Sequence, residues 1–225
     1  MIEAKNISLI YGDGTRALKD VNLTIEMGEL AYIIGPSGSG KTSLLKLFMG
    51  MEYPTEGQLK VLGLAMKKEE EANIRRLRRL VGPVFQEFKL IKGRTALENV
   101  ILGLRFLDIP SRAIKEEAKN SLEKVGLGHK IDTLVEHLSY GETQRVAIAR
   151  AVARKPVLIL ADEPTGNLDM DNAMKIMKLL ASFRSEDTAV VITTHATHLL
   201  EEIEEGKLIR VDKGSVGVES RGGVQ

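Results

Sequence analysis

The sequence predicts an α/β protein in which a mostly parallel sheet is flanked by helices and an α-helical subdomain is inserted into the chain. An apolar run, a glycine-rich loop and a helical pattern follow one another within residues 30–50. Strand and helix patterns alternate again over residues 157–211, as in parallel β-α-β units, and the stretch between these parts is mostly helical in pattern. We therefore expect one domain, divided into an α/β core (1–86 and 157–214), a helical subdomain (87–156) and a flexible tail (215–225).

Composition excludes several classes of function. The 225 residues include 32 basic and 31 acidic ones, and the resulting net charge of +1 gives no overall attraction to nucleic acid or to an anionic membrane. Without cysteine, the chain forms neither disulfides nor thiolate metal sites. The first residues lack the apolar core of a secretory signal, and no apolar run approaches the ~20 residues of a membrane-spanning helix. Work at a membrane would therefore require a partner.

The N-terminal third predicts strands around a helix. Ala17–Ile25 alternates apolar and polar residues, as expected for a half-buried strand in an N-terminal antiparallel portion. Leu30–Ile34 is continuously apolar, which is typical of a buried central strand. A helix is predicted over residues 41–50, a charged helix over Lys67–Leu80 and a further strand over Val81–Gln86.

The middle and the C-terminal half continue this alternation. Glu87–Gly128 is mostly helical in pattern, and Ser111 is the expected N-cap of one helix there. Strands at Val157–Leu160 and Ala189–Thr193 are joined by a helix over Asn172–Phe183, so we expect them to be parallel. The last expected elements are a strand at Leu208–Val211 and a frayed polar tail at Ser215–Gln225.

The glycine-rich loop carries the most specific chemistry. Residues 35–42 read GPSGSGKT and match G-x-x-x-x-G-K-[ST], between the strand and the helix that this motif requires. Its glycines let backbone N–H groups face phosphates, and the helix start adds its positive end. Lys41 is expected to reach the β- and γ-phosphates, and the Thr42 hydroxyl to bind Mg²⁺. The motif predicts a P-loop NTPase core that binds ATP through Gly35, Pro36, Ser37, Gly38, Ser39, Gly40, Lys41, Thr42 and Ser43.

A second predicted strand ends in two carboxylates. Residues 158–163, LILADE, place Asp162 and Glu163 at the carboxyl end of an apolar run. Asp162 is suited to hold Mg²⁺, and Glu163 to orient or deprotonate the attacking water. Because two acids after an apolar run are also common in plain turns, the catalytic interpretation depends on the phosphate loop.

The four residues Ser139-Tyr140-Gly141-Glu142 begin an apolar helix and match a capping box. In a capping box, Ser139 is the N-cap and Glu142 bonds back to it. The same geometry directs free N–H groups outward, where they can receive a phosphate. Capping and phosphate contact are therefore compatible interpretations of one helix start.

The order and spacing of these motifs resemble ATP-binding cassette (ABC) ATPases over about residues 2–212. The resemblance rests on the phosphate loop, LSYGE (138–142), LILADE (158–163), Asn167-Leu168-Asp169 and Thr194-His195. It implies a Mg²⁺-dependent ATPase that forms a homodimer on ATP. Each ATP would lie between the phosphate loop of one copy and the Ser139 helix start of the other.

Single residues take their expected roles from this resemblance. Tyr11 would stack on adenine, and Gln86 would sense Mg²⁺ and link to a membrane partner. Taken alone, these two side chains and that of His195 would be ordinary polar or aromatic residues. The catalytic residues would be Glu163, His195 and Lys41. ATP contacts across the dimer would come from Ser139, Gly141, Glu142 and Asp169, and the Mg²⁺ ligands would be Thr42, Gln86 and Asp162.

Two residues depart from the family pattern. Tyr140 replaces the first glycine of the signature Leu-Ser-Gly-Gly, so the backbone loses easy access to positive φ and the dimer seam gains bulk. Since Ser139 and Gly141 are retained, we expect Tyr140→Gly to keep ATPase activity. Ala196 follows the histidine where an acidic residue is frequent, which leaves the local hydrogen bonding open.

The finer resemblance is to one branch of the family. Residues 161–169, ADEPTGNLD, resemble lipoprotein-release and macrolide-export ATPases and the cell-division ATPases of the FtsE type, and residues 85–90, FQEFKL, favour the last. The branch implies a location on the cytoplasmic face of the inner membrane and an integral, permease-like FtsX-like partner whose movement regulates cell-wall hydrolysis. The ATPase of a lipoprotein or macrolide exporter is the alternative.

Two regions keep more than one interpretation. The apolar side chains Phe85, Phe88, Leu90 and Ile91 form either a docking groove for the membrane partner or part of the helical subdomain's core. The arginines of residues 75–79 form either a solvated helix face or a contact with anionic headgroups.

Other classes of ABC ATPase fit less well. A DNA-repair or chromosome-organising ATPase would separate its motifs by a long coiled coil, and residues 43–137 contain no sustained heptads. A ribosome-associated tandem protein would carry two cassettes, whereas this chain carries one set of motifs.

Overall fold

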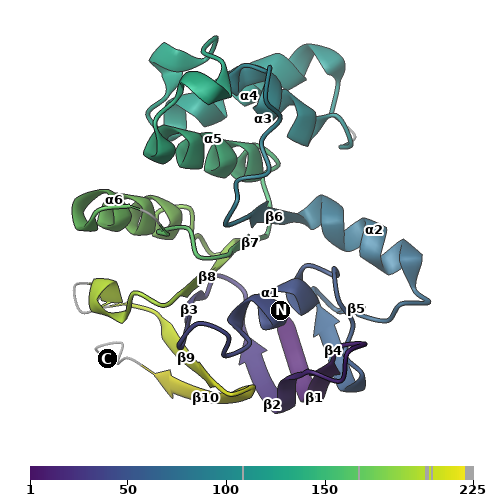
Figure 1. The fold of residues 1–225 in the computed structure, drawn as a ribbon. Coiled ribbons are helices and arrows are strands. Elements are labelled where there is room, and N and C mark those ends of the chain that lie inside the picture. The colour runs from purple at the N-terminus through teal and green to yellow at the C-terminus, as the bar shows by residue number, and fades with distance from the viewer. Residues whose placement is uncertain (108, 167, 201–202, 204, 221–225) are drawn as a thin grey trace.

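The computed structural model describes residues 1–225 except 108, 167, 201, 202, 204 and 221–225. Two sheets lie at one end of the molecule and a group of helices lies at the other (Figure 1). This arrangement confirms the predicted α/β class with an inserted helical part. None of the helices in the described ranges has the length and hydropathy of a bilayer-crossing segment.

The smaller sheet is antiparallel and includes the N-terminal strand. Its strands follow the order β2-β1-β4-β5 and are β1 (Ile2–Ile10), β2 (Arg16–Ile25), β4 (Glu56–Val61) and β5 (Leu64–Ala65). Along β2, Leu18, Val21, Leu23 and Ile25 are buried and the residues between them are exposed. The alternation read from the sequence therefore gives the sheet one apolar face.

The larger sheet is parallel except for its last strand. Its order is β10-β9-β3-β8-β7-β6, with β3 (Leu30–Ile34), β6 (Val81–Val84), β7 (Leu158–Ala161), β8 (Ala189–Thr194), β9 (Lys207–Asp212) and β10 (Ser215–Ser220). Strands β3, β7 and β8 are buried along their whole length. Continuous apolar runs fit these positions because both faces of the sheet are covered.

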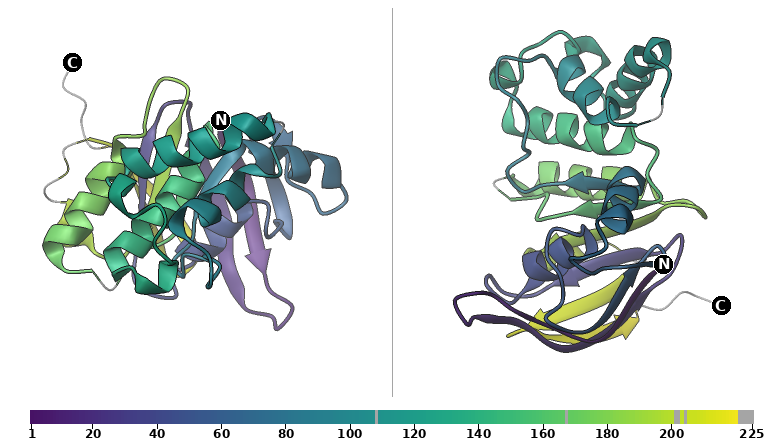
Figure 2. Two further views of the ribbon diagram at one scale, coloured as in Figure 1. Left: turned by 90° about the horizontal axis from the view of Figure 1, so that it is seen from above. Right: turned by 90° about the vertical axis from the view of Figure 1, so that its right-hand side faces the viewer.

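The helices form two groups. Helices α1 (Lys41–Phe48), α2 (Glu71–Leu80) and α6 (Met170–Ala181) accompany the sheets. The helical unit at the other end consists of α3 (Ala96–Leu104), α4 (Ser111–Lys124) and α5 (Tyr140–Val152), as the right view of Figure 2 also shows. One apolar core surrounds α1 between the sheets, and a second joins the other face of the parallel sheet to α6 and the helical unit.

Two helix starts differ from the sequence prediction. Helix α2 begins at Glu71 and not at Lys67, because the chain is still held at the antiparallel sheet by the bond from Met66 N–H to Leu59 O (2.9 Å). Helix α4 has Pro110 at its N-cap, and Ser111 is its first helical residue without a capping bond. The prediction that Ser111 caps this helix is therefore wrong.

The start of α6 and the C-terminal tail also differ. Asp169 caps α6, since its Oδ1 accepts from Asn172 N–H at 2.9 Å, and the helix begins at Met170. The frayed tail is wrong for residues 215–220, which form β10 as a hairpin with β9. Lys213 and Gly214 reverse the chain with φ of 46° and 81°. The remaining predicted tail, 221–225, lies outside the described residues.

Candidate functional site

The carboxyl ends of four neighbouring strands meet at one edge of the parallel sheet. Strand β3 leads into Gly35, β7 into Asp162, β8 into His195 and β6 toward Gln86. The strands are parallel and in order β3-β8-β7-β6, so these ends are adjacent. Open α/β sheets bind ligands at this edge. The sheet order therefore assembles residues that are far apart in the sequence.

The loop after β3 requires glycine at two close approaches of the backbone. A Cβ on Gly35 (φ 154°) would lie 2.0 Å from Val211 O, and one on Gly40 (φ 113°) would lie 2.6 Å from Ala17 O. Gly40 is also the N-cap of α1 and makes no side-chain capping bond. The N–H groups of the first turn are therefore not occupied by a capping side chain and face the site as an anion-binding helix start.

A pocket of about 460 Å³ lies over this loop. Of the predicted ATP-binding residues, those that line it are Tyr11, Ser37, Gly38, Gly40, Lys41, Thr42, Ser43 and Gln86. Glu163 lines it as well, whereas Gly35, Pro36 and Ser39 are not part of its lining. The hydroxyl of Tyr11 lies 3.0 Å from Ser43 Oγ, which joins the strand end after β1 to the start of α1.

Part of this lining was not predicted from the sequence. Arg16 and Ala17 at the start of β2 and Lys213 and Gly214 in the β9–β10 turn also face the pocket. The turn is fixed to the phosphate loop, because Gly214 N–H donates to Ser39 O at 2.9 Å. The pair Lys213-Gly214 between short apolar stretches was the available signal for this hairpin turn.

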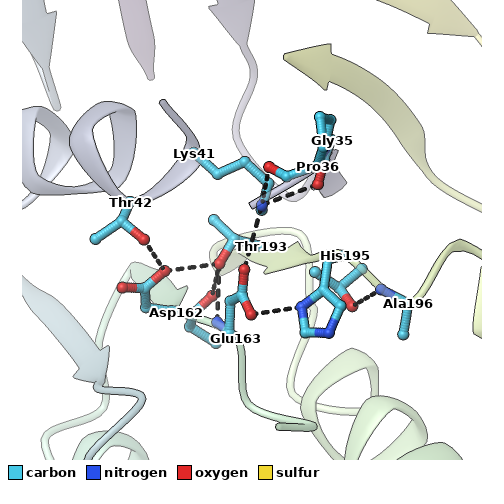
Figure 3. Close-up of polar contacts among 11 residues, drawn as sticks. Gly35, Pro36, Lys41, Thr42, Asp162, Glu163, Thr193, His195 and Ala196 are labelled. Atoms are coloured by element: carbon cyan, nitrogen blue, oxygen red, sulfur yellow. Dashed lines mark hydrogen bonds and ion pairs between the residues drawn. The ribbon is translucent and has the colours of Figure 1, made fainter. Parts of the chain in front are cut away.

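Lys41 is buried among oxygen atoms, and its side chain is only 3% exposed. Its Nζ donates to Gly35 O (2.9 Å) and Pro36 O (3.0 Å) and lies 3.2 Å from Glu163 Oε1 (Figure 3). The ammonium group thus has one partner for each of its three N–H bonds. It is held next to the catalytic candidate Glu163 at the centre of the site.

A buried threonine organises the two carboxylates. Thr193 Oγ1 donates to Asp162 Oδ1 at 2.8 Å and accepts from Glu163 N–H at 2.8 Å. Glu163 has a φ of 42°, a left-handed conformation that costs a non-glycine residue roughly 1–2 kcal/mol. The Thr193 bond stabilises that conformation. Sequence reasoning treated Thr193 only as part of an apolar strand, although a hydroxyl at a strand's carboxyl end was a usable signal.

Glu163 also contacts the predicted catalytic histidine. Its Oε2 lies 2.6 Å from His195 Nδ1, and the imidazole is more than half exposed (Figure 3). This contact leaves Nε2 of His195 for another partner. Ala196 N–H donates to Thr194 Oγ1 at 3.0 Å, which answers the question that the family departure at Ala196 raised.

The oxygen atoms beside the phosphate loop fit Mg²⁺. Thr42 Oγ1 donates to Asp162 Oδ1 at 3.1 Å, and Gln86 lines the same pocket as Thr42. Hydroxyl, carboxylate and amide oxygens are the ligands that Mg²⁺ prefers, usually together with substrate phosphates. In the described part of the chain, no three His, Cys, Asp or Glu residues cluster as a metal site. A Mg²⁺ ion held jointly with phosphates does not need such a cluster.

The start of α5 is the predicted capping box. Ser139 Oγ accepts from Glu142 N–H at 3.3 Å, and Glu142 Oε2 accepts from Ser139 N–H at 2.9 Å. The pKa of the Glu142 carboxyl is lowered to about 2, mainly because Lys130 Nζ donates to its other oxygen at 2.6 Å and also because of the bond from Ser139. Both carboxylate oxygens of Glu142 are therefore engaged within the chain.

The first turn of α5 does not need positive φ. Tyr140 and Gly141 are both helical, so the tyrosine causes no backbone strain there. A Cβ on Gly141 would meet only Leu168 Cδ2, at 3.7 Å. Packing within the chain thus gives no reason for glycine at this position, and the small residue leaves the helix start accessible from outside.

The structure separates the predicted site residues into two places. The first group of predicted site residues lines the pocket over the phosphate loop or bonds to residues that line it. The second group does not line that pocket and consists of Ser139, Gly141, Glu142 and Asp169. Asp169 follows Leu168, which neighbours Gly141, so this second group has its own surface. Asn167, part of the same motif, lies outside the described residues.

The apolar segment around Gln86 has no single role. Phe85 lines a second pocket, Leu90 packs on the helical unit's core, and Ile91 is half exposed. The ring of Phe88 packs edge-on against Tyr140 with a centroid distance of 4.8 Å. Leu90 therefore belongs to the core as one interpretation predicts, whereas the docking groove stays a prediction.

Known proteins are similar to this chain over most of its length. A family model described as ABC transporter matches residues 18–166. The cell division ATP-binding protein FtsE of Streptococcus pneumoniae serotype 2 is 37% identical over 225 residues, which cover 96% of this chain and 98% of that protein. The lipoprotein-releasing system ATP-binding protein LolD of Aquifex aeolicus is 39% identical over 216 residues, which cover 93% of this chain and 96% of that protein.

A solved structure shares the fold over the full length. The ATP-binding cassette MJ0796, described as a dimer in a post-hydrolysis state bound to ADP and Pi, matches with a TM-score of 0.88 and 36% sequence identity, and all of both chains is covered. The similarity thus extends over the core, the helical unit and the site.

Proposed function

From the premise that the chain belongs to the ABC transporter family and is an ATP-hydrolysing subunit homologous to FtsE and LolD, we propose that two copies enclose two ATP molecules and that closure of this dimer moves a membrane partner. Each ATP lies between one copy's phosphate loop and the other copy's helix start at Ser139 and Gly141. The similar MJ0796 cassette is dimeric with ADP and Pi. The proposal rests on the separation of Ser139 and Gly141 from their own chain's pocket.

Hydrolysis in this proposal depends on the cluster around Glu163. Its carboxylate orients the attacking water and accepts its proton, a role that contributes roughly 10²–10⁴-fold to rates. The γ-phosphate takes over the ammonium of Lys41 and frees Glu163 from the 3.2 Å ion pair. His195 holds Glu163 through Nδ1 and offers Nε2 to the γ-phosphate.

The remaining site residues hold the nucleotide and the ion. Tyr11 stacks on adenine, the N–H groups of the phosphate loop hold the phosphates, and Thr42, Asp162 and Gln86 bind Mg²⁺. When bound, Mg²⁺ neutralises phosphate charge during the displacement. Asp169 reaches the partner copy beside Gly141. Glu142 shapes the helix start through its bonds with Lys130 and Ser139, and its contact with the partner copy's ATP stays a prediction.

A charge at Gly141 tests the shared site. Gly141→Glu places a carboxylate where the partner's γ-phosphate would lie, and we expect kcat to fall roughly 100-fold or more, as when one oxyanion contact is removed. The matched control is Gly217→Glu in β10, where a Cβ meets no atom within 4 Å. Steady-state phosphate release measures both. Undiminished activity of Gly141→Glu, with normal thermal unfolding, contradicts the proposal.

The membrane partner is proposed to dock on a second pocket beside Gln86. This pocket of about 410 Å³ is lined by Met49, Met51, Arg78, Val81, Pro83, Phe85 and Arg154. Met51 is 49% exposed, and the two arginines flank an otherwise apolar lining. A short apolar segment with an acidic residue fits this surface. We assign it to a cytoplasmic segment of an FtsX-like membrane protein, on the strength of the identity with FtsE.

Two exposed methionines allow a controlled test of this docking surface. Met51→Asp is expected to reduce recovery of a co-expressed FtsX-like protein by roughly tenfold or more, the cost of an apolar hot-spot residue. Met27→Asp is the control, because Met27 is 52% exposed and does not line the pocket. Equal recovery with both variants overturns the docking site.

The proposed location is the cytoplasmic face of the inner membrane, where such a partner would hold the subunit. Regulation of cell-wall hydrolysis is the favoured output because residues 85–90 resemble the FtsE type and FtsE matches at nearly full length. The similarity to LolD supports a second candidate, the ATPase of a lipoprotein-release system. The identity of the permease recovered with the chain distinguishes the two.

A further inference from the structure

The segment that follows Gln86 is tied to α5 at both ends of the helix. Near the helix start, the Phe88 ring meets the Tyr140 ring with an interplanar angle of 63° and a centroid distance of 4.8 Å. Near the helix end, Arg150 Nη2 donates to Phe88 O at 2.5 Å and Nη1 donates to Lys89 O at 2.6 Å. Two side chains ten residues apart on one helix therefore both contact Phe88, and Arg150 also binds Lys89.

The backbone of Phe88 and Lys89 adopts a strained conformation that allows Arg150 to bind both carbonyl groups. Phe88 and Lys89 have φ of 59° and 51°, although neither is glycine. Successive left-handed residues turn both carbonyls toward the single guanidinium group of Arg150. Burial lowers the pKa of Arg150 to about 10, which still leaves it charged at neutral pH. Gly103 makes room for it, since a Cβ there would lie 2.7 Å from Arg150 Cγ.

Helix α3 holds the next residues of the segment. Asn99 is 1% exposed, and its Oδ1 accepts from Ile91 N–H at 2.7 Å while its Nδ2 donates to Ile91 O at 3.1 Å. Residues 88–91 thus belong mechanically to the helical unit, whereas Gln86 lines the nucleotide pocket. Only Glu87 separates the two.

We propose that Tyr140 and Phe88 form an aromatic latch that fixes Gln86 relative to the Ser139–Gly141 helix start. Tyr140 stands between Ser139 and Gly141, in place of a glycine that could not make this contact. The latch makes Tyr140 a positioning residue for the ATPase reaction. The latch rests on the proposed function, because it connects Gln86, at the Mg²⁺ of one proposed ATP site, to the helix start that contributes to the second ATP site of the dimer.

The latch is tested by the Mg²⁺ dependence of ATP hydrolysis. Tyr140→Gly and Phe88→Leu should each raise the half-saturating Mg²⁺ concentration by about 2- to 10-fold, the range expected from one aromatic pair. The kcat at saturating Mg²⁺ should remain, as expected from the retained Ser139 and Gly141. Tyr140→Phe keeps the ring and should behave as the wild type.

A double-mutant cycle separates the latch from independent effects. If the two rings act only through each other, Tyr140→Gly combined with Phe88→Leu should shift the Mg²⁺ dependence no more than either single change. Three results would overturn the latch. The half-saturating Mg²⁺ concentration could change by the product of the two single effects in the double variant, or not change in either single variant. It could also change as much in Tyr140→Phe as in Tyr140→Gly. If Tyr140→Gly fails to fold, Tyr140→Leu takes its place in the cycle.

Failure of the latch is distinguishable from failure of the shared ATP site. The Gly141→Glu experiment does not depend on Tyr140. If Gly141→Glu loses activity while the latch variants keep the wild-type Mg²⁺ dependence, the proposal of a shared ATP site stands and only the latch is contradicted. Full activity of Gly141→Glu removes the shared site itself.

Discussion

At the scale of single residues, the predicted catalytic side chains contact one another directly. Lys41, Glu163 and His195 form a continuous chain of contacts of 3.2 Å and 2.6 Å. Thr193 fixes both Asp162 and the strained backbone of Glu163. Such strain persists only where neighbouring bonds over-determine the conformation, and it is common at active sites.

Thr193→Val tests this role of the buried hydroxyl. Valine has the same shape, so its main effect is to leave Glu163 N–H without its partner and Asp162 Oδ1 with the Thr42 hydroxyl alone, at a cost of about 1–3 kcal/mol. We expect kcat to fall by about tenfold or more and the melting temperature to drop by several degrees. Thr193→Ser retains the hydroxyl and is the control. Wild-type kcat in the valine variant would show that Thr193 does not position Glu163.

Sequence reasoning located the residues of this site but not their contacts. The phosphate loop and the Asp162-Glu163 pair are local patterns, and local patterns are readable without a fold. The bond between Thr42 and Asp162 joins residues 120 positions apart and depends on the order of β3, β8 and β7 in the sheet. Lys213 was missed because it belongs to a hairpin that was expected to be a frayed tail.

At the scale of elements, capping decides where several helices begin. Thr95 caps α3 in a complete capping box with Glu98, the same arrangement as Ser139 and Glu142 at α5. Ser111 was expected to cap α4, yet Pro110 occupies that position. A serine before a helical pattern is ambiguous by one residue, because the first helical turn also tolerates serine.

These two residues give a matched prediction for stability. Thr95→Ala removes the bond from Glu98 N–H to Thr95 Oγ1 (3.1 Å) and should lower the free energy of unfolding by about 1 kcal/mol. Ser111→Ala removes no capping bond and should change it by less than about 0.5 kcal/mol. Chemical denaturation measures both. Equal losses would mean that Ser111 caps α4 after all.

At the scale of the whole molecule, the chain has two separate surfaces, and each surface supplies one half of a different proposed ATP site. The pocket over the phosphate loop and the Ser139–Gly141 helix start do not meet within one chain. Periodicity and motifs predicted the helices around the parallel sheet and most strands of that sheet, but not strands β1, β4, β5 and β10. A site that is complete only in a dimer has no signal in the sequence beyond the family resemblance, and packing within the chain does not require a small residue at Gly141.

The mass of Glu163→Gln with ATP and Mg²⁺ tests the dimeric site most directly. Without the carboxylate that accepts the proton of water, hydrolysis should stop while the phosphate contacts remain, so ATP should hold two copies together. Light scattering after size-exclusion chromatography should give twice the 24.8 kDa mass of one chain with ATP, and a single chain's mass with ADP. A variant that binds ATP and remains at 24.8 kDa would contradict the account.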